Sequence, residues 1–355
     1  MTEPEPSSPA PHRRRVRYSG RNPRQFAEKY KEHNPAQHPD TVSKIIASGK
    51  TPAGTHRPIM VEEVLSALQP APGQVGCDAT LGYGGHTVEL LKKLAPGGHL
   101  IALDTDPLEL PRTEERLRAL GYDPDALTVM HTSFAGISRA LLQKDFPTVD
   151  FILADLGLSS MQIDNPARGF TFKENAPLDL RLNPRKGEPA SAWLARWSLP
   201  ELTQIFADYG DELRPAEYAQ RIVETRQRIP LLRTTDLATL LRDVTTGNGR
   251  LPIDPDEVNK SIQRLFQAIR IAVNNEMDAL TEFLRQLPTC LKPGGRAAIL
   301  TFHSGEDRRV KKAFEDGLQR QTYAEISTDP IRPTPEEVRA NPRSRSAKLR
   351  WALKA

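Results

Sequence analysis

The chain has 355 residues, of which 38% are hydrophobic and 26% are charged. That length allows a full hydrophobic core and predicts a division into two domains. No apolar run approaches the roughly 18 residues that a membrane-spanning helix needs, and the acidic, proline-rich start lacks the features of a secretory signal. Two cysteines, Cys77 and Cys290, are too few for a disulfide scaffold or a zinc cluster. We therefore expect a cytoplasmic protein with no membrane contact and no metal site.

The net charge of +4 is unevenly distributed. Residues 1–50 carry ten Lys and Arg against five Asp and Glu, residues 332–355 carry seven against two, and the remainder sums to −6. Basic ends on an acidic body predict contact with a polyanion, and the clusters Arg13–Arg17 and Arg343–Arg345 favour RNA. The alternative is that the terminal charge only keeps the tails soluble. We expect residues 1–50, which are rich in proline, to be a mostly disordered basic extension.

An alternation of strands and helices follows, beginning with a predicted helix at Val61–Leu68, and it indicates a parallel α/β fold. Short apolar runs predict strands at Val75–Ala79, Leu100–Asp104, Leu127–His131, Val149–Ala154 and Ala297–Phe302. Helical patterns separate the first four, at Thr87–Leu94, Pro107–Leu120 and Ile137–Gln143.

Between the fourth and fifth strands the alternation stops. Residues 165–255 predict loops and helices, with helical spacing at Leu199–Tyr209, Ala219–Arg226 and Leu237–Val244. One long helix, Val258–Leu287, is expected to return the chain to the sheet. The predicted architecture is a doubly wound sheet built from residues 51–164 and 256–355, with residues 165–255 as an inserted helical domain for substrate recognition.

A glycine-rich loop, Asp78–His86, joins the first strand to the first helix. Glycines there let a ligand approach the backbone, and Asp104, about 20 residues after Gly84, ends the second strand where an acid accepts hydrogen bonds from a ribose. The third glycine of a dinucleotide motif is replaced by Thr87, and the acid before the loop suits a cation. S-adenosylmethionine therefore fits better than the cofactor of a nicotinamide or flavin oxidoreductase. The alternatives are such an oxidoreductase, or a turn that merely connects strand and helix.

The ends of the fourth and fifth strands supply the candidate catalytic groups, because they face the same crevice. Asp155 ends the fourth strand and is expected either to orient an acceptor amine or only to contact the cofactor. His303 follows the fifth strand and is a candidate proton acceptor near neutral pH. Methyl transfer needs mainly alignment of acceptor, methyl and sulfur, together with a group that takes the acceptor's proton.

The loop after the fourth strand combines arginine and aromatic residues, which a splayed-out base would use through stacking and edge contacts. Phe170 and Phe172 could equally form the core between the two domains. Trp193 and Trp197, four residues apart, are expected to pack within the helical insert.

These segments together resemble the bacterial 16S ribosomal RNA (cytosine-N4)-methyltransferase H family over about residues 55–355. The resemblance is carried by His56–Pro58, Asp78–His86, Asp104–Pro107, Asp155–Gln162, Gly169–Phe172, Pro177–Arg181, Phe266–Ile271, Phe302–Arg308 and Asn341–Arg350. It implies a class I methyltransferase fold, S-adenosylmethionine as methyl donor, and N4 methylation of a cytidine in the decoding centre of the small ribosomal subunit.

The resemblance also implies site residues. Cofactor contacts would be Gly84, Gly85, His86, Asp104, Phe134, Asp155 and Gln162, and candidate RNA contacts are Arg168, Phe170, Arg181, Arg343 and Arg345. The chain departs from the family at Gly305, usually leucine, and at Asn259–Ile262, usually proline-alanine-threonine-arginine. Two further functions stay open: a ribosome-assembly factor that binds rRNA without turnover, and a methyltransferase for another RNA amine.

Overall fold

The computed structural model describes residues 58–355. The predictions for residues 1–50, including the basic extension, lie outside the described residues. The described part forms a seven-stranded sheet in the order β3-β2-β1-β4-β5-β7-β6, in which β7 runs antiparallel to both of its neighbours and the other pairs are parallel. The strands are β1 Val75–Asp78, β2 His99–Asp104, β3 Leu127–His131, β4 Val149–Asp155, β5 Leu291–Thr301, β6 Tyr323–Ile326 and β7 Lys348–Lys354.

Helices cover both faces of this sheet. One face packs against α3 (Val61–Leu68), α4 (Gly85–Leu94) and α5 (Glu109–Ala119), and the other against α6 (Ile137–Leu142), α13 (Glu276–Cys290) and α14 (Ser304–Gln319). Strand β4 shows how the sequence achieves this, because Phe151 and Leu153 point into the first layer while Ile152 and Ala154 point into the second. The predicted doubly wound α/β fold is confirmed.

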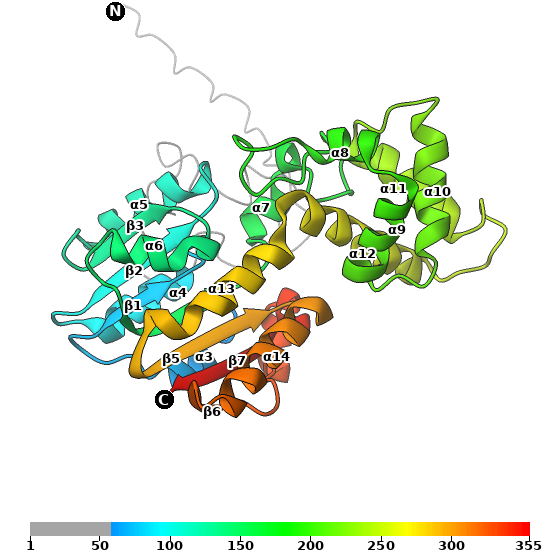
Figure 1. The fold of residues 1–355 in the computed structure, drawn as a ribbon. Helices are drawn as coiled ribbons and strands as arrows, with labels where there is room; N and C mark the ends of the chain where they lie inside the picture. Colours follow the sequence, from blue (N-terminus) through cyan, green and yellow to red (C-terminus); the bar gives the residue numbers. More distant parts are fainter. Residues whose placement is uncertain (1–57) are drawn as a thin grey trace, which may run out of the picture.

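A separate group of helices lies beyond one side of the sheet, at the upper right of Figure 1. It comprises α8 Ala190–Arg196, α9 Leu199–Gly210, α10 Pro215–Arg226, α11 Thr234–Thr245 and α12 Pro255–Asn274. Its buried residues form one cluster of their own, around Tyr218, Phe206 and Leu241. Trp193 and Trp197 stack with ring centroids 5.5 Å apart and belong to this cluster, as expected.

The prediction of a single helix over Val258–Leu287 is wrong. Helix α12 ends at Asn274 and α13 begins at Glu276, because Asn275 between them has a left-handed backbone (φ 52°), which asparagine tolerates better than most residues. The two helices also pack differently: α12 contributes to the cluster of the insert, and α13 covers the sheet. The helical cluster therefore extends past residue 255, where the predicted domain boundary lies.

The C-terminal strands β6 and β7 were not predicted, and β5 begins six residues before the predicted strand. Strand β5 starts with Leu291 opposite Val149, and its pairing with β4 resumes at Arg296 after a register shift. Among the described residues, no helix combines the length and apolarity needed to cross a bilayer.

Candidate functional site

The glycine loop after β1 is shaped by backbone conformations and close packing. Gly82 and Gly84 have left-handed backbones, with φ of 50° and 75°. A Cβ added at Gly85, the first residue of α4, would lie 2.6 Å from Cγ of Pro58. The loop therefore requires glycine at these positions.

Asp78 is buried and holds this loop by hydrogen bonds. It is 1% exposed, and its carboxylate accepts hydrogen bonds from the Thr87 hydroxyl (2.7 Å) and the Thr80 backbone N–H (3.1 Å). Burial raises the pKa of Asp78, and the bond from Thr87 opposes that rise. Asp78 does not line the cavity described below, and that its charge favours a cationic ligand stays a prediction. Thr87, which replaces the third glycine of a dinucleotide motif, bonds this acid.

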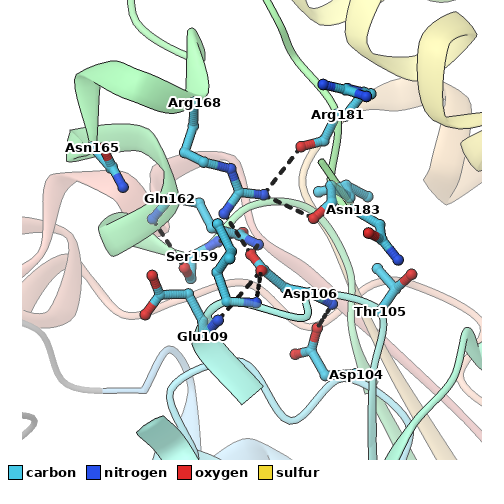
Figure 2. Close-up of polar contacts among 12 residues, drawn as sticks. Asp104, Thr105, Asp106, Glu109, Ser159, Gln162, Asn165, Arg168, Arg181 and Asn183 are labelled. Carbon is cyan, nitrogen blue, oxygen red and sulfur yellow. Dashed lines mark hydrogen bonds and ion pairs between the residues drawn. The ribbon is translucent and has the colours of Figure 1, made fainter. Parts of the chain in front are cut away.

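Asp104 ends β2 and is held on both oxygens by backbone donors. Gly82 N–H donates to Oδ2 (2.7 Å) and Asp106 N–H to Oδ1 (2.8 Å), and the latter bond is drawn in Figure 2. Burial raises the pKa of Asp104 to about 6, although both backbone donors act in the opposite direction. Each oxygen keeps lone-pair capacity for a further donor such as a ribose hydroxyl.

His86 and Asp155 meet above the glycine loop. His86 Nε2 lies 3.5 Å from Asp155 Oδ2, and the histidine is 7% exposed. Burial acts to lower the pKa of His86, but the hydrogen bond and the charge of Asp155 outweigh it, so that the pKa is raised. Within the described part of the chain, Asp155 Oδ1 is buried without a hydrogen-bond partner. Buried polar atoms usually have a hydrogen-bond partner, so this oxygen is available to a donor on a bound ligand.

Phe134 and Gln162 complete the predicted cofactor set. Phe134 opens the short 3-10 helix η2 (Phe134–Gly136), half-buried, with its ring edge-on to Phe283 at 5.4 Å. Gln162 lies in α7 (Ser160–Asp164). Its side-chain oxygen accepts from the Ser159 N–H (3.0 Å), and its amide nitrogen donates to Asp106 (2.8 Å).

His303 caps the N-terminus of α14 and is tied to Glu306. Its Nδ1 accepts from the Glu306 backbone N–H (3.4 Å), and its Nε2 lies 3.1 Å from Glu306 Oε1. Burial acts to raise the pKa of Glu306, but the hydrogen bond from His303 outweighs it and lowers that pKa. Both ring nitrogens thus contact Glu306, and accepting a proton from a substrate would require His303 to leave this arrangement.

The five candidate RNA residues differ in how they are held. Arg168, in the 3-10 helix η3 (Pro166–Arg168), is only 4% exposed and pairs with Asp106 at 2.7 Å. Arg181 pairs with Asp179 (2.7 Å), and Arg343 with Asp164 (2.9 Å). Phe170 is half-buried against the helical cluster, whereas Arg345 is exposed on the 3-10 helix η4 (Pro342–Ser346).

A single cavity of about 1260 Å³ collects most of these groups. From the sheet side it is lined by Gly85, His86, Asp104, Phe134, Asp155, Gln162 and His303, from the insert side by Phe170 and Arg181, and from the C-terminal 3-10 helix η4 by Arg343. Gly84, Arg168 and Arg345 do not line it. Sequence reasoning missed Lys173, Lys186 and Asn274, which line the insert side. The only signal in the sequence was the positive charge of Lys173 and Lys186 within segments predicted to be loops.

Comparison with known proteins assigns the chain to a family. The sequence profile described as the MraW methylase family matches residues 53–355. The chain is 50% identical to "Ribosomal RNA small subunit methyltransferase H 2" of Alkaliphilus metalliredigens over 96% of this chain and 97% of the relative. It is 49% identical to "Ribosomal RNA small subunit methyltransferase H 1" of Lachnoclostridium phytofermentans over 97% and 93%.

A more distant relative, "Ribosomal RNA small subunit methyltransferase H" of Thermomicrobium roseum, is 41% identical over 84% of this chain and 93% of its own length. The alignments with the Alkaliphilus and Lachnoclostridium proteins cover 96% and 97% of this chain, which is more than residues 51–355 alone provide. They therefore include part of the N-terminal extension, which lies outside the family profile. The resemblance inferred from the sequence motifs is confirmed: the chain belongs to the MraW methylase family.

Proposed function

We propose that this protein transfers a methyl group from S-adenosylmethionine to the N4 amine of a cytidine in the decoding centre of 16S rRNA. The observation that carries the proposal is the shared cavity. One wall presents Asp104, Phe134 and Asp155 from the carboxyl edge of the sheet, and the other presents Phe170 and Arg181 from the insert. A cofactor on the first wall and a flipped base on the second would meet inside it.

The residues on the sheet side fit S-adenosylmethionine. The half-buried Asp104 carboxylate has capacity for the ribose hydroxyls, and the ring of Phe134 offers a face to an adenine. The unpartnered Oδ1 of Asp155 suits an N–H donor, either from the amino group of the cofactor or from the acceptor base. When bound, the cofactor supplies an electrophilic methyl group on a sulfonium.

The acceptor amine needs orientation, since its lone pair is delocalised into the cytosine ring. Asp155 accepts an N–H of the amine and thereby turns the lone pair toward the incoming methyl group. The His86 imidazole lies beside the other oxygen of this carboxylate, with Nε2 3.5 Å from Oδ2, which leaves Oδ1 for the amine. The amine loses a proton as its bond to the methyl group forms. His303, once released from Glu306, is the candidate that accepts this proton.

The insert is proposed to hold the RNA. Lys173 and Lys186 of the insert are exposed and line the cavity. Arg345, on the C-terminal 3-10 helix η4, is also exposed and stands in the sequence between the cavity residues Arg343 and Ser346. Cations at the rim of a cleft suit phosphates of a folded RNA, while Phe170 suits a stacked base. We further propose that the substrate is the 30S subunit or its rRNA, encountered in the cytoplasm.

The test is transfer of labelled methyl from S-adenosylmethionine to unmethylated 30S subunits and, separately, to naked 16S rRNA. The product is digested to nucleosides and identified. N4-methylcytidine is expected, and the better substrate would place the step in ribosome assembly. Label in another nucleoside would refute the cytidine assignment in favour of another RNA amine. No transfer despite tight binding of S-adenosylhomocysteine would favour the assembly factor.

The catalytic assignment is tested with Asp155→Asn and His303→Ala. We expect Asp155→Asn to reduce kcat by at least about a hundredfold, because it removes the charge that orients the amine. His303→Ala is expected to reduce it as well, if the ring accepts the proton. Retention of full turnover in either variant, with S-adenosylhomocysteine binding intact, would remove that residue from the catalytic set.

A further inference from the structure

Asp106, two residues beyond the ribose-site acid Asp104, is the centre of a buried polar network (Figure 2). It is 1% exposed, and Oδ1 accepts from the backbone N–H groups of Leu108 (2.9 Å) and Glu109 (3.3 Å). Oδ2 accepts from Gln162 Nε2 (2.8 Å) and from Arg168 Nη1 (2.7 Å). Its carboxylate therefore joins the start of α5, helix α7 and the first turn of the insert.

Arg168 continues this network toward the substrate side of the cavity. Its Nη2 donates to the carbonyl oxygens of Arg181 (3.0 Å) and Leu182 (2.8 Å). These carbonyls belong to the 181–187 loop, which contributes Arg181, Leu182, Asn183, Lys186 and Gly187 to the cavity lining. One buried guanidinium thus ties a wall of the cavity to Asp106.

The same loop has a second anchor at the end of α12. Leu182 N–H donates to Asn274 Oδ1 (2.6 Å), and Asn274 Nδ2 donates to the carbonyl of Leu180 (2.7 Å). At the other end of the network, Asp106 N–H donates to Asp104 Oδ1 (2.8 Å). A continuous series of hydrogen bonds therefore connects the ribose-site carboxylate to the insert.

We propose that Arg168 is a positioning residue that couples the cofactor site to the 181–187 loop, and not a direct contact to RNA; this rests on the proposed function. Only a planar guanidinium can donate at once to a carboxylate and to two carbonyls in this geometry. Hydrogen bonds from a ligand's hydroxyls to Asp104 restrict the motion of the turn that contains Asp106. Arg168, which bonds both Asp106 and two carbonyls of the loop, restricts the motion of the loop in turn. Cofactor and RNA then favour each other's binding reciprocally.

The first experiment measures the loop directly, without RNA or turnover. Trypsin cleavage after Arg185 and Lys186, which are exposed, is followed by mass spectrometry with and without saturating S-adenosylhomocysteine. In the wild type we expect the ligand to slow cleavage at these sites. In Arg168→Gln we expect cleavage about tenfold faster than in the wild type and no longer slowed by the ligand. Protection by the ligand that survives in Arg168→Gln, or that is absent in the wild type, would overturn the proposal.

Two variants separate coupling from a general loss of structure. Arg214→Gln is the matched control, because Arg214 lies on the insert in a surface pair with Glu217 on α10 and should leave the cleavage at the loop unchanged. Arg168→Lys keeps a charge beside Asp106 but cannot reach both carbonyls, so it is expected to fold even if Arg168→Gln does not, and to lose the ligand effect. An Arg168→Lys variant whose loop is protected like the wild type would contradict the proposal.

The second experiment distinguishes positioning from RNA contact. We expect Arg168→Lys to bind S-adenosylhomocysteine within about threefold of the wild type, and to reduce kcat/KM for the RNA substrate by about tenfold or more. The slope of log affinity against log salt for RNA should stay as in the wild type. A slope reduced by about one, with loop protection intact, would make Arg168 a phosphate contact instead. If the wild type shows protection of the loop by the ligand but no methyl transfer, the proposed function fails while the coupling between the cofactor site and the 181–187 loop stands.

Discussion

Cofactor binding should weaken in acid because of one carboxyl group, Asp104. Burial raises its pKa to about 6 in the free protein. A ligand whose hydroxyls donate to Asp104 favours the ionised form and returns its pKa toward the ordinary value near 4. Lowering the pH from 7 to 5 therefore protonates Asp104 in the free protein before it does so in the complex.

The size of the effect follows from these two pKa values. At pH 5 about nine in ten Asp104 carboxyls of the free protein are protonated, whereas in the complex about one in ten is. The affinity for S-adenosylhomocysteine should accordingly fall about tenfold between pH 7 and pH 5, which corresponds to about 1.4 kcal/mol.

Titration calorimetry of S-adenosylhomocysteine at pH 5, 6 and 7 measures this directly. Measuring the binding heat in two buffers of different ionisation enthalpy counts the proton released when the ligand binds at pH 5. Asp104→Asn should bind more weakly at pH 7 and lose most of the pH dependence, and any dependence that remains would report on other groups such as His86. A wild-type affinity that changes by less than twofold between pH 7 and pH 5 would refute the reasoning.

The raised pKa also affects stability without ligand. Because its folded pKa lies above the ordinary 3.8, Asp104 contributes stability that is complete below that value and is lost as the pH rises through about 6. Between pH 5 and pH 7 this group should lower the free energy of unfolding by about 1 kcal/mol. Urea unfolding of the wild type and Asp104→Asn at both pH values isolates the contribution; equal differences at the two pH values would contradict it.

Three further predictions test packing and charge. Gly85→Ala forces a Cβ to 2.6 Å from Pro58 Cγ, so affinity for S-adenosylhomocysteine should fall by about tenfold or more in calorimetry; unchanged affinity would show that the loop shifts freely. Phe134→Ala removes a cavity-lining ring and should weaken the same affinity by about 1–3 kcal/mol, and a loss of melting temperature alone would assign Phe134 to the core. Arg350→Met leaves the buried Asp307 with one partner fewer, which should cost about 3 kcal/mol in urea unfolding at pH 7. Burial acts to raise the pKa of Asp307, but the hydrogen bonds from Arg350 and Lys348 outweigh it, so that the pKa is lowered. The stability lost in Arg350→Met should therefore shrink as the pH falls below 4. A loss of stability that is independent of pH would contradict the assignment.

Local pattern was sufficient for the parallel part of the sheet. Strands buried on both faces are continuous apolar runs, and each is followed by a helix whose apolar residues recur at helical spacing, so β1 to β4 were predicted within about two residues of their observed ends. The glycine loop and Asp104 were found for the same reason, since each lies at the carboxyl end of a predicted parallel strand and such ends share one edge of the sheet. Strands β6 and β7 escaped prediction because they are stabilised by antiparallel pairing with each other and with β5, which no local pattern encodes.

The break at Asn275 also depended on long-range contacts. Helical periodicity continues across it, and the chain turns there because α12 packs in the helical cluster and α13 packs on the sheet.

By itself, then, the sequence determined the fold class, the family and the edge of the sheet where the predicted cofactor residues lie. Only the tertiary structure decided which partners several charged residues have there. The sequence made Arg168 a candidate RNA contact, and the structure shows it buried against Asp106, which lies 62 positions earlier in the chain. Asp78 had the position of a ligand-binding acid, yet it bonds Thr87 beneath the loop. The physical reason is that a charge acts on whatever lies within a few ångströms, and the partners of a buried charge are chosen by the packing of distant segments.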